Sequence, residues 1–198
     1  MPARRSCASG PPTARLPWRR FCDAGQDGRN RLARKGELRV SIDPASFKEL
    51  FANWPSAVAV ITCRGTDGEP KGFTASSFDP LSLDPPLVLF TLHKKAGSLP
   101  HFEAAAGFGV NALRAGHEEL SARFASPEPD RFRGLKYTLG QTGAPLLADA
   151  WARIECRTRH RYDGGDHILF VGEIIALEFE PAEPLVYHRR RYRRVTDV

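Results

Sequence analysis

The sequence predicts a mainly β protein with short helices, folded as a closed or nearly closed antiparallel barrel. Roughly six or seven apolar segments recur at regular spacing, and turn sequences such as Asp67-Gly68 and Asp163-Gly164 join them as hairpins. Many short strands joined in this way are typical of antiparallel barrels. No alternation of strand and helix indicates a doubly wound sheet. No Gly-x-Gly-x-x-Gly run follows a strand, so we do not expect a Rossmann dinucleotide site.

The charge of the chain divides it into two parts. Residues 1–40 carry ten Arg or Lys and three Asp or Glu, whereas the rest of the chain is nearly neutral. We expect residues 1–40 to be a disordered basic tail and residues 41–198 to form one domain. A transit peptide, a nucleic-acid arm or a start codon placed too far upstream would give the same tail. Because the domain has no excess of positive charge, no nucleic-acid partner is expected.

The hydropathy and the cysteines indicate a cytoplasmic protein. No apolar run reaches about 18 residues, so we expect no membrane-spanning helix, and residues 1–40 lack the apolar stretch of a secretory signal. Four cysteines show no Cys-x-x-Cys spacing, and Cys63 and Cys156 fall within apolar strand patterns. We therefore expect buried, reduced thiols and no metal site.

The first half of the domain predicts one helix and three strands. The helix begins at a cap formed by Asp43 or Ser46 and ends before Pro55. Its apolar residues fall on one face, at i, i+3, i+4 and i+7: Phe47, Leu50, Phe51 and Trp54. Strands are expected at residues 57–63, after the turn at 66–69 through Phe73, and at 87–92. The near-continuous apolar character of residues 87–92 predicts burial on both faces.

The second half predicts two helices and four further strands. Ser98 can cap a helix over residues 99–105, and another helix is expected over 117–124. The expected strands are residues 107–113, 151–162, 167–179 and 184–188. Residues 126–144 contain three Gly and two Pro, which predicts a long loop of the kind that is often functional or mobile.

A run of small hydroxyl residues lies between two apolar strands and is a candidate ligand site. Thr74-Ala75-Ser76-Ser77, followed by Phe78, offers backbone N–H groups and hydroxyls with little side-chain bulk, which suits a flat, phosphorylated cofactor. The loop that follows the third strand adds Lys94, Lys95 and Ser98, groups that can bind a phosphate. Alternatively, the hydroxyl run is a strand-end turn with local hydrogen bonds, and the lysines belong to a solvated loop.

Four segments, in the same order, make residues from about 45 to 195 similar to the short-chain flavin reductases. These are the reductase components of two-component flavin-dependent monooxygenases. The segments are Trp54-Pro55-Ser56-Ala57-Val58, Gly72–Phe90 with its Ser-Leu-Asp-Pro-Pro run, Gly165-Asp166-His167, and Pro184–Arg189 leading to Arg191-Tyr192-Arg193. The resemblance implies an FMN-binding split β-barrel that reduces FMN or FAD with NADH or NADPH. It also implies a homodimer with the flavin near the subunit interface and an oxygenase component that receives the reduced flavin.

The resemblance implies roles for individual residues. Residues 74–77 match the segment that holds the isoalloxazine edge and ribityl chain, and Lys94, Lys95 and Ser98 match the phosphate-binding loop. His167 matches a position associated with the nicotinamide, and Tyr187, Arg191 and Tyr192 match a C-terminal segment near the cofactor. Two segments depart from the family: Pro55-Ser56-Ala57 replaces Pro-Thr-Gly, and Arg189-Arg190-Arg191 replaces Arg-Gly-Arg. Taken alone, His167 could equally cap the hairpin and the arginines could form a basic terminus.

Hydride transfer from a nicotinamide to a flavin needs no side-chain acid or base at its first step, so no catalytic residue is predicted. The protein must hold two flat rings at reacting distance and stabilise negative charge at flavin N1 and O2. The N–H groups of residues 74–78 are candidates for that stabilisation. Two alternatives are a split-barrel protein that keeps its flavin bound and acts on its own substrate, and a non-catalytic flavin- or haem-binding protein.

Overall fold

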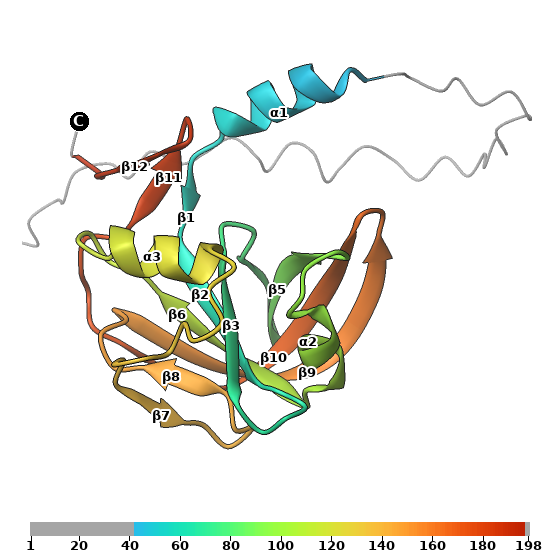
Figure 1. Ribbon diagram of the computed structural model, residues 1–198, viewed down its shortest axis with the longest axis vertical. Coiled ribbons are helices and arrows are strands. Elements are labelled where there is room, and N and C mark those ends of the chain that lie inside the picture. Colours follow the sequence, from blue (N-terminus) through green and yellow to red (C-terminus); the bar gives the residue numbers. More distant parts are fainter. Residues whose placement is uncertain (1–41, 197–198) are drawn as a thin grey trace, which may run out of the picture. The chain divides into compact units, whose positions relative to one another are not determined.

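The structure, a computed structural model, describes residues 42–196, and the predicted tail over residues 1–40 lies outside them. The described residues form three helices and twelve strands (Figure 1). In chain order these are α1 (Pro44–Ala52), β1 (Ser56–Ala57), β2 (Ala59–Arg64), β3 (Pro70–Ala75), β4 (Asp79–Leu83), β5 (Pro86–His93), α2 (Leu99–Ala104), β6 (Gly107–Ala112), α3 (Glu118–Ala125), β7 (Tyr137–Leu139), β8 (Pro145–Leu147), β9 (Ala152–Gly164), β10 (His167–Phe179), β11 (Val186–His188) and β12 (Arg191–Arg193).

Seven strands form the main sheet, in the order β3–β2–β6–β9–β10–β5–β4, and every neighbouring pair is antiparallel. Its longest hairpin joins β9 to β10 through Gly165, which has a φ of 84° that favours glycine. β1, β11 and β12 form a separate three-stranded sheet, and β7 pairs with β8. The architecture is therefore mainly β and antiparallel, as the sequence predicts.

The main sheet closes on itself because its two edge strands are joined by only three residues. β3 ends at Ala75 and β4 begins at Asp79, although the two strands lie at opposite edges of the sheet. Four Cα–Cα steps span at most about 15 Å, so the sheet must curl until its edges come together at residues 76–78. Within the described domain no ladder joins β3 to β4. The barrel is therefore split at this point, which we call the seam, and the prediction of a split barrel is confirmed.

Ser77, which lies just before β4, forms hydrogen bonds with the backbone of β5. Asp79 pairs with Leu89, and the same register places Ser77 opposite Thr91. The Ser77 Oγ donates to the Thr91 carbonyl over 3.2 Å and accepts from the Thr91 N–H over 3.3 Å. One hydroxyl thus replaces both backbone hydrogen bonds of a ladder pair, and the main chain can turn toward β3 without leaving Thr91 unpaired.

A cluster of phenylalanine rings fills the barrel. The fully buried Phe90 ring on β5 stacks on Phe170 of β10 and meets Phe108 of β6 edge to face, each with centroids 4.8 Å apart. Phe102 of α2 adds a third ring at 5.8 Å. A Cβ at Gly172 would lie 2.4 Å from the Phe108 ring, so glycine is required beside it. This one cluster connects three strands and α2, because each contributes a ring to the same volume.

A second apolar cluster lies on the other face of β2, beneath α3 and β8. It consists of Val58, Val60, Leu113, Phe124, Phe132, Leu147 and Leu185. Fully buried polar groups join this layer to the sheet: the Asn111 Nδ2 donates to the Val60 carbonyl over 3.1 Å, and its Oδ1 accepts from the Leu147 N–H over 2.7 Å. β2 is consequently buried on both faces, with Ile61 in the barrel and Val60 outside it.

The outer face of β5 corrects one prediction. Residues 87–92 do not lie buried on both faces: Val88, Phe90 and Leu92 are buried, whereas Leu87, Leu89 and Thr91 alternate with them and stay partly exposed. The predicted loop over residues 126–144 contains β7 and leads into β8, and sequence patterns also missed β4 and β12. These strands have three to five residues, too few for an alternation to stand out.

The first helix is well capped but poorly covered. The Asp43 carboxylate accepts a hydrogen bond from the Ser46 N–H over 2.9 Å, which confirms the predicted cap. The helix ends at Ala52, so the predicted face loses Trp54, which follows it. The four side chains predicted for this face are all at least half exposed: Phe47 by 52%, Leu50 by 63%, Phe51 by 51% and Trp54 by 68%. The Arg189 N–H donates to the Ala52 carbonyl over 2.7 Å and connects the end of α1 to the turn after β11. None of the helices within residues 42–196 is long and apolar enough to cross a membrane.

We expect Phe90→Ala to lower the free energy of unfolding by about 3–5 kcal/mol, because it leaves a cavity among the surrounding rings. Urea denaturation followed by fluorescence measures this change. Phe179→Ala is the matched control, since Phe179 is 60% exposed and its removal should cost less than about 0.5 kcal/mol. Equal losses for the two variants would contradict the assigned core.

Candidate functional site

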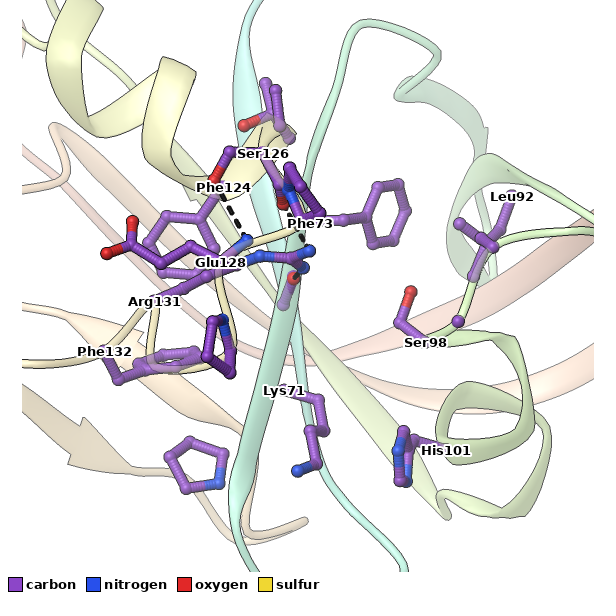
Figure 2. Close-up of a pocket in the computed structure, with 18 residues that line it drawn as sticks. Lys71, Phe73, Leu92, Ser98, His101, Phe124, Ser126, Glu128, Arg131 and Phe132 are labelled. Carbon is purple, nitrogen blue, oxygen red and sulfur yellow. Dashed lines mark hydrogen bonds between the residues drawn. The ribbon is translucent and has the colours of Figure 1, made fainter.

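A pocket of about 610 Å³ opens between β3, α2 and the segment that follows α3. We call it the β3–α2 pocket; Figure 2 shows the side chains around it. Its lining residues are Pro70, Lys71, Gly72, Phe73, Thr74, Leu92, Ala96, Gly97, Ser98, His101, Phe124, Ala125, Ser126, Pro127, Glu128, Pro129, Arg131 and Phe132. The volume suits a ligand of cofactor size.

The pocket has aromatic walls on two sides. Phe124 at the end of α3 meets Phe132 edge to face, with ring centroids 5.0 Å apart. Phe73 on β3 packs edge to face against Phe102 with centroids 5.3 Å apart, which connects this wall to the barrel core. Walls of this kind can hold a flat ring system, because aromatic faces pack well against one another.

Arg131 joins the segment after α3 to β3. Its Nη1 donates to the Gly72 carbonyl over 2.8 Å, and its Nη2 donates to the Ser126 carbonyl. Among residues 42–196 no carboxylate forms an ion pair with it, and its buried Nε has no hydrogen-bond partner. The guanidinium is compensated by carbonyl dipoles alone, and with Lys71 it gives the lining two positive charges against the one carboxylate of Glu128, which favours an anionic ligand.

Lys71 and His101 lie at one end of the pocket (Figure 2). The Lys71 Nζ lies 2.7 Å from the Asp67 carboxylate, and hydrogen bonding to Lys71 lowers the pKa of Asp67. The His101 Nδ1 lies 3.2 Å from the Thr66 N–H and 3.1 Å from the Thr66 hydroxyl. Both pocket residues are thus anchored to the β2–β3 turn.

Two of the predicted residues line the pocket. Thr74 lies on β3, where its hydroxyl donates to the Ser121 carbonyl over 2.6 Å, and Ser98 precedes α2 with no side-chain capping bond. Ala75 is buried beside Thr74. The seam residues Ser76, Ser77 and Phe78 follow β3 directly and do not line the pocket.

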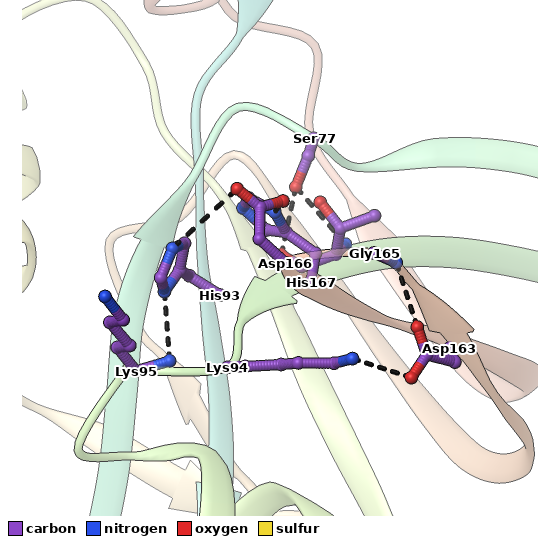
Figure 3. A network of polar contacts seen from close by, with 9 residues as sticks. Ser77, His93, Lys94, Lys95, Asp163, Gly165, Asp166 and His167 are labelled. Carbon is purple, nitrogen blue, oxygen red and sulfur yellow. Dashed lines mark hydrogen bonds and ion pairs between the residues drawn. The ribbon is translucent and has the colours of Figure 1, made fainter. Parts of the chain in front are cut away.

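The predicted basic loop and His167 belong to a separate polar network, shown in Figure 3. The His167 Nδ1 lies 2.7 Å from Asp166, and His93 faces it across the β5–β10 ladder with ring centroids 5.0 Å apart. Lys94 pairs with Asp163 at 2.6 Å, and the Lys95 N–H donates to the His93 Nδ1 over 2.9 Å. Hydrogen bonds from His167 and Lys94 lower the pKa values of Asp166 and Asp163 respectively. Neither lysine lines the pocket.

The predicted C-terminal residues form the β11–β12 hairpin. Tyr187 and Tyr192 pair across it with ring centroids 5.4 Å apart, and the Tyr192 hydroxyl lies 2.9 Å from the Ser121 Oγ. Ser121 therefore connects this hairpin to Thr74 on β3. Arg191 is exposed. The departure from Arg-Gly-Arg falls in the turn, where Arg189 and Arg190 adopt φ values of 52° and 58°, a left-handed conformation that costs a side chain some strain.

Sequence patterns did not single out Lys71, His101 or Arg131, although all three line the pocket. They come from segments about 30 residues apart that only the barrel closure brings together. The sequence offered one indication of Lys71. It lies two residues before Phe73 in the strand that leads into the hydroxyl run, and side chains two residues apart on a strand share a face.

The expectations for cysteine and metal concern other parts of the domain. Cys63 and Cys156 are buried, and burial raises the pKa of each thiol to about 12, so neither is a reactive thiolate at neutral pH. Residues 42–196 hold no group of three or more His, Cys, Asp or Glu side chains placed to bind a metal ion. Cys7 and Cys22 lie outside the described residues.

Comparison with known proteins gives one consistent family. The family model described as flavin reductase like domain matches residues 51–196. The chain is 38% identical over 154 residues to the actinorhodin polyketide dimerase of Streptomyces coelicolor, an alignment that covers 77% of this chain and 87% of that protein. It is 37% identical over 158 residues to HsaB of Mycobacterium tuberculosis, the reductase subunit of a flavin-dependent monooxygenase, with 78% of this chain and 84% of that protein covered.

A solved structure shows the same fold. It is the NADH:FAD oxidoreductase SgcE6 of Streptomyces globisporus C-1027, in complex with NAD and FAD fragments. The TM-score is 0.73 and the identity is 38%, over 79% of this chain and 96% of that chain. The predicted flavin-reductase-like fold is thereby confirmed.

We expect Arg131→Met to loosen the segment after α3, because it removes two charge-assisted hydrogen bonds, each typically worth about 1.5–3 kcal/mol. Amide hydrogen exchange over residues 126–135 should accelerate at least about tenfold. Arg133→Met is the matched control, since no side-chain hydrogen bond or ion pair of the exposed Arg133 occurs within residues 42–196. Unchanged exchange in Arg131→Met would show that the guanidinium does not hold this segment.

Proposed function

Since the chain belongs to the flavin reductase like family, we propose that it transfers a hydride from NADH or NADPH to FMN or FAD. The reduced flavin then passes to a partner monooxygenase. The observation that carries this proposal is the β3–α2 pocket, which is lined by the Gly72–Thr74 part of the family's flavin segment. It is an oxidoreductase function that requires two cofactors and no side-chain acid or base.

The residues of the pocket fit a flavin nucleotide. Phe73, Phe124 and Phe132 provide aromatic walls for the isoalloxazine ring system, and the unpaired charge of Arg131 suits an electron-rich or phosphorylated ligand. Thr74 and Ser98 provide hydroxyls for the ribityl chain and the phosphate. The flavin supplies the chemistry when bound, by accepting the hydride at its N5 atom.

The protein contributes position and electrostatics. The aromatic walls restrict the ring plane, and the hydrogen bond to the Ser121 carbonyl keeps the Thr74 side chain in place. The backbone N–H groups of residues 74–78 are the proposed stabilisers of negative charge on the reduced flavin. Because the Arg131 guanidinium bridges β3 and the segment after α3, the two sides of the pocket stay at a fixed separation.

The polar network at the β9–β10 turn is the proposed nicotinamide-binding region. His167 is half exposed, and Asp166 fixes its ring through the Nδ1 contact. Its exposed side is available to a nicotinamide or its ribose. Lys94, Lys95, Tyr187, Arg191 and Tyr192 complete the proposed set of cofactor-binding residues around the pocket and the network.

The partner is proposed from the relatives. HsaB is named as the reductase subunit of a flavin-dependent monooxygenase, so a reductase of this family can work with a separate oxygenase. The polyketide dimerase is named for a reaction on a substrate of its own, which supports a second candidate function, in which the protein acts on its own substrate. In that case we expect the flavin to stay bound. The two candidates differ in whether flavin leaves the protein after reduction.

The first prediction of this proposal is flavin-dependent oxidation of a nicotinamide. We expect the purified protein to be colourless and to oxidise NADH or NADPH only when FMN or FAD is added. The loss of absorbance at about 340 nm measures this oxidation. A yellow protein that turns over nicotinamide without added flavin would support the second candidate instead. Flavin binding without oxidation of either nicotinamide would contradict both enzymatic functions.

We further propose that the protein is a homodimer in which α1 packs against the second copy. The support is the apolar face of α1, which no side chain within residues 42–196 buries. An isolated helix of nine residues is marginal in water, so its stability requires packing on that face. The partly exposed outer face of β5 adds further apolar surface on the same domain.

We expect Leu50→Glu to dissociate the dimer. Each protomer loses the burial of one leucine, about 1.5–3 kcal/mol, so the dissociation constant rises about 100-fold or more. Light scattering coupled to size-exclusion chromatography measures the mass, and Lys48→Gln on the polar side of the same helix is the control, because it also lowers the charge by one unit. A monomeric wild type, or a dimeric Leu50→Glu variant, would exclude this interface. Repeating the measurement without residues 1–41 tests whether those residues cover the face instead.

A further inference from the structure

The hydrogen bonds of His101 define which ring nitrogen carries its proton. The Thr66 N–H can only donate, and it points at the His101 Nδ1 over 3.2 Å. The Nδ1 must therefore accept, so the neutral imidazole carries its proton on Nε2. The Thr66 hydroxyl, 3.1 Å from the same nitrogen, can also donate to it. Thr66 thus fixes both the orientation of the ring and its tautomer.

The Nε2–H of His101 is an uncommitted donor at the pocket. No hydrogen bond to Nε2 occurs within residues 42–196, and this nitrogen is not a buried unsatisfied atom. His101 lines the pocket, and Figure 2 places it at the same end as Lys71. Lys71 has three N–H donors, and its ion pair with the half-exposed Asp67 leaves others available. Ser98 adds a hydroxyl that makes no capping bond.

We propose that His101, Lys71 and Ser98 form the subsite for a phosphate group of the flavin nucleotide. This inference rests on the proposed function. Donors without bound acceptors are what a phosphate requires, because its oxygens accept several charge-assisted hydrogen bonds. The three residues come from β3 and from α2 with the residue before it, so the subsite lies between two elements of the same domain. The aromatic rings Phe124 and Phe132 line another part of the pocket and suit the uncharged ring system.

The rival location for the phosphate is the pair Lys94 and Lys95. Lys94 lies 2.6 Å from Asp163, and neither lysine lines the pocket. Lys71 and Lys94 each hold an ion pair, with Asp67 and Asp163 respectively, so the lysines do not separate the two locations. The His101 Nε2–H does, because no acceptor within the described domain bonds to it. The geometry therefore favours the pocket subsite over the loop lysines.

The test compares the affinities for riboflavin and FMN, which differ by the phosphate alone. The readout is the ratio of the riboflavin dissociation constant to the FMN dissociation constant, from fluorescence titration. We expect His101→Asn to lower this ratio about tenfold, since a charge-assisted hydrogen bond is worth at least that factor. Asparagine can still accept from the Thr66 N–H but cannot place a donor at the Nε2 position. His101→Gln, whose amide N–H reaches toward that position, should recover part of the ratio. His160→Asn is the matched control, because His160 is an exposed histidine on β9 that lies outside the pocket.

Several results would overturn the inference. Equal weakening of riboflavin and FMN by His101→Asn would show that His101 only shapes the pocket. A ratio that falls in a Lys94→Ala, Lys95→Ala double variant and not in His101→Asn would locate the phosphate at the loop. A raised Michaelis constant for NADH with an unchanged flavin ratio would assign the subsite to the nicotinamide nucleotide. Riboflavin reduction by the wild type tests the proposed function separately, because riboflavin carries no phosphate: an unchanged ratio with active riboflavin reduction refutes the subsite alone.

Discussion

The shortness of the seam determines the shape of this domain. Three residues connect strands at opposite edges of a seven-stranded sheet. Because so short a segment cannot span a flat sheet, the sheet must curl into a barrel. Closure places β3 at an open edge, where α2 and the segment after α3 can approach it, and the pocket forms among these three elements. Ser77 makes the sharp departure from β5 tolerable, because its hydroxyl replaces two backbone hydrogen bonds of Thr91. Within the hydroxyl run, Thr74 thus lines the pocket, whereas Ser77 stabilises the seam of the barrel.

The sequence predicted the long elements well, and the physical reason is their pattern. The β9–β10 hairpin has an Asp-Gly-Gly-Asp turn between long strands, and α1 has a capping aspartate and a proline after its end. Short strands such as β4 and β12 escaped notice because three to five exposed residues show no periodicity. The burial of residues 87–92 was overestimated, since apolar character alone does not show whether a second layer covers the outer face.

The candidate site was only partly accessible to sequence reasoning. Thr74 and Ser98 were predicted and do line the pocket, because each lies in a local pattern, a hydroxyl run and a helix start. Lys71, His101 and Arg131 became visible only through the fold, since they approach one another after barrel closure. His167 and Lys94 were placed by resemblance, and the structure gives them partners in Asp166 and Asp163 at the β9–β10 turn. Their part in cofactor binding is still a prediction.

The two ways in which the pocket is held together respond differently to acid. The ion pair between Lys71 and Asp67 requires an ionised carboxylate. Hydrogen bonding to Lys71 lowers the pKa of Asp67, so the ion pair persists through the ordinary aspartate range and is lost only as pH falls through the depressed pKa. The Arg131 bridge contains no titrating group, because a guanidinium stays protonated at every pH at which proteins fold and its acceptors are backbone carbonyls. Acidification would therefore free the Lys71 ammonium from Asp67 at one end of the pocket, while the Arg131 hydrogen bonds at the opposite wall stay intact.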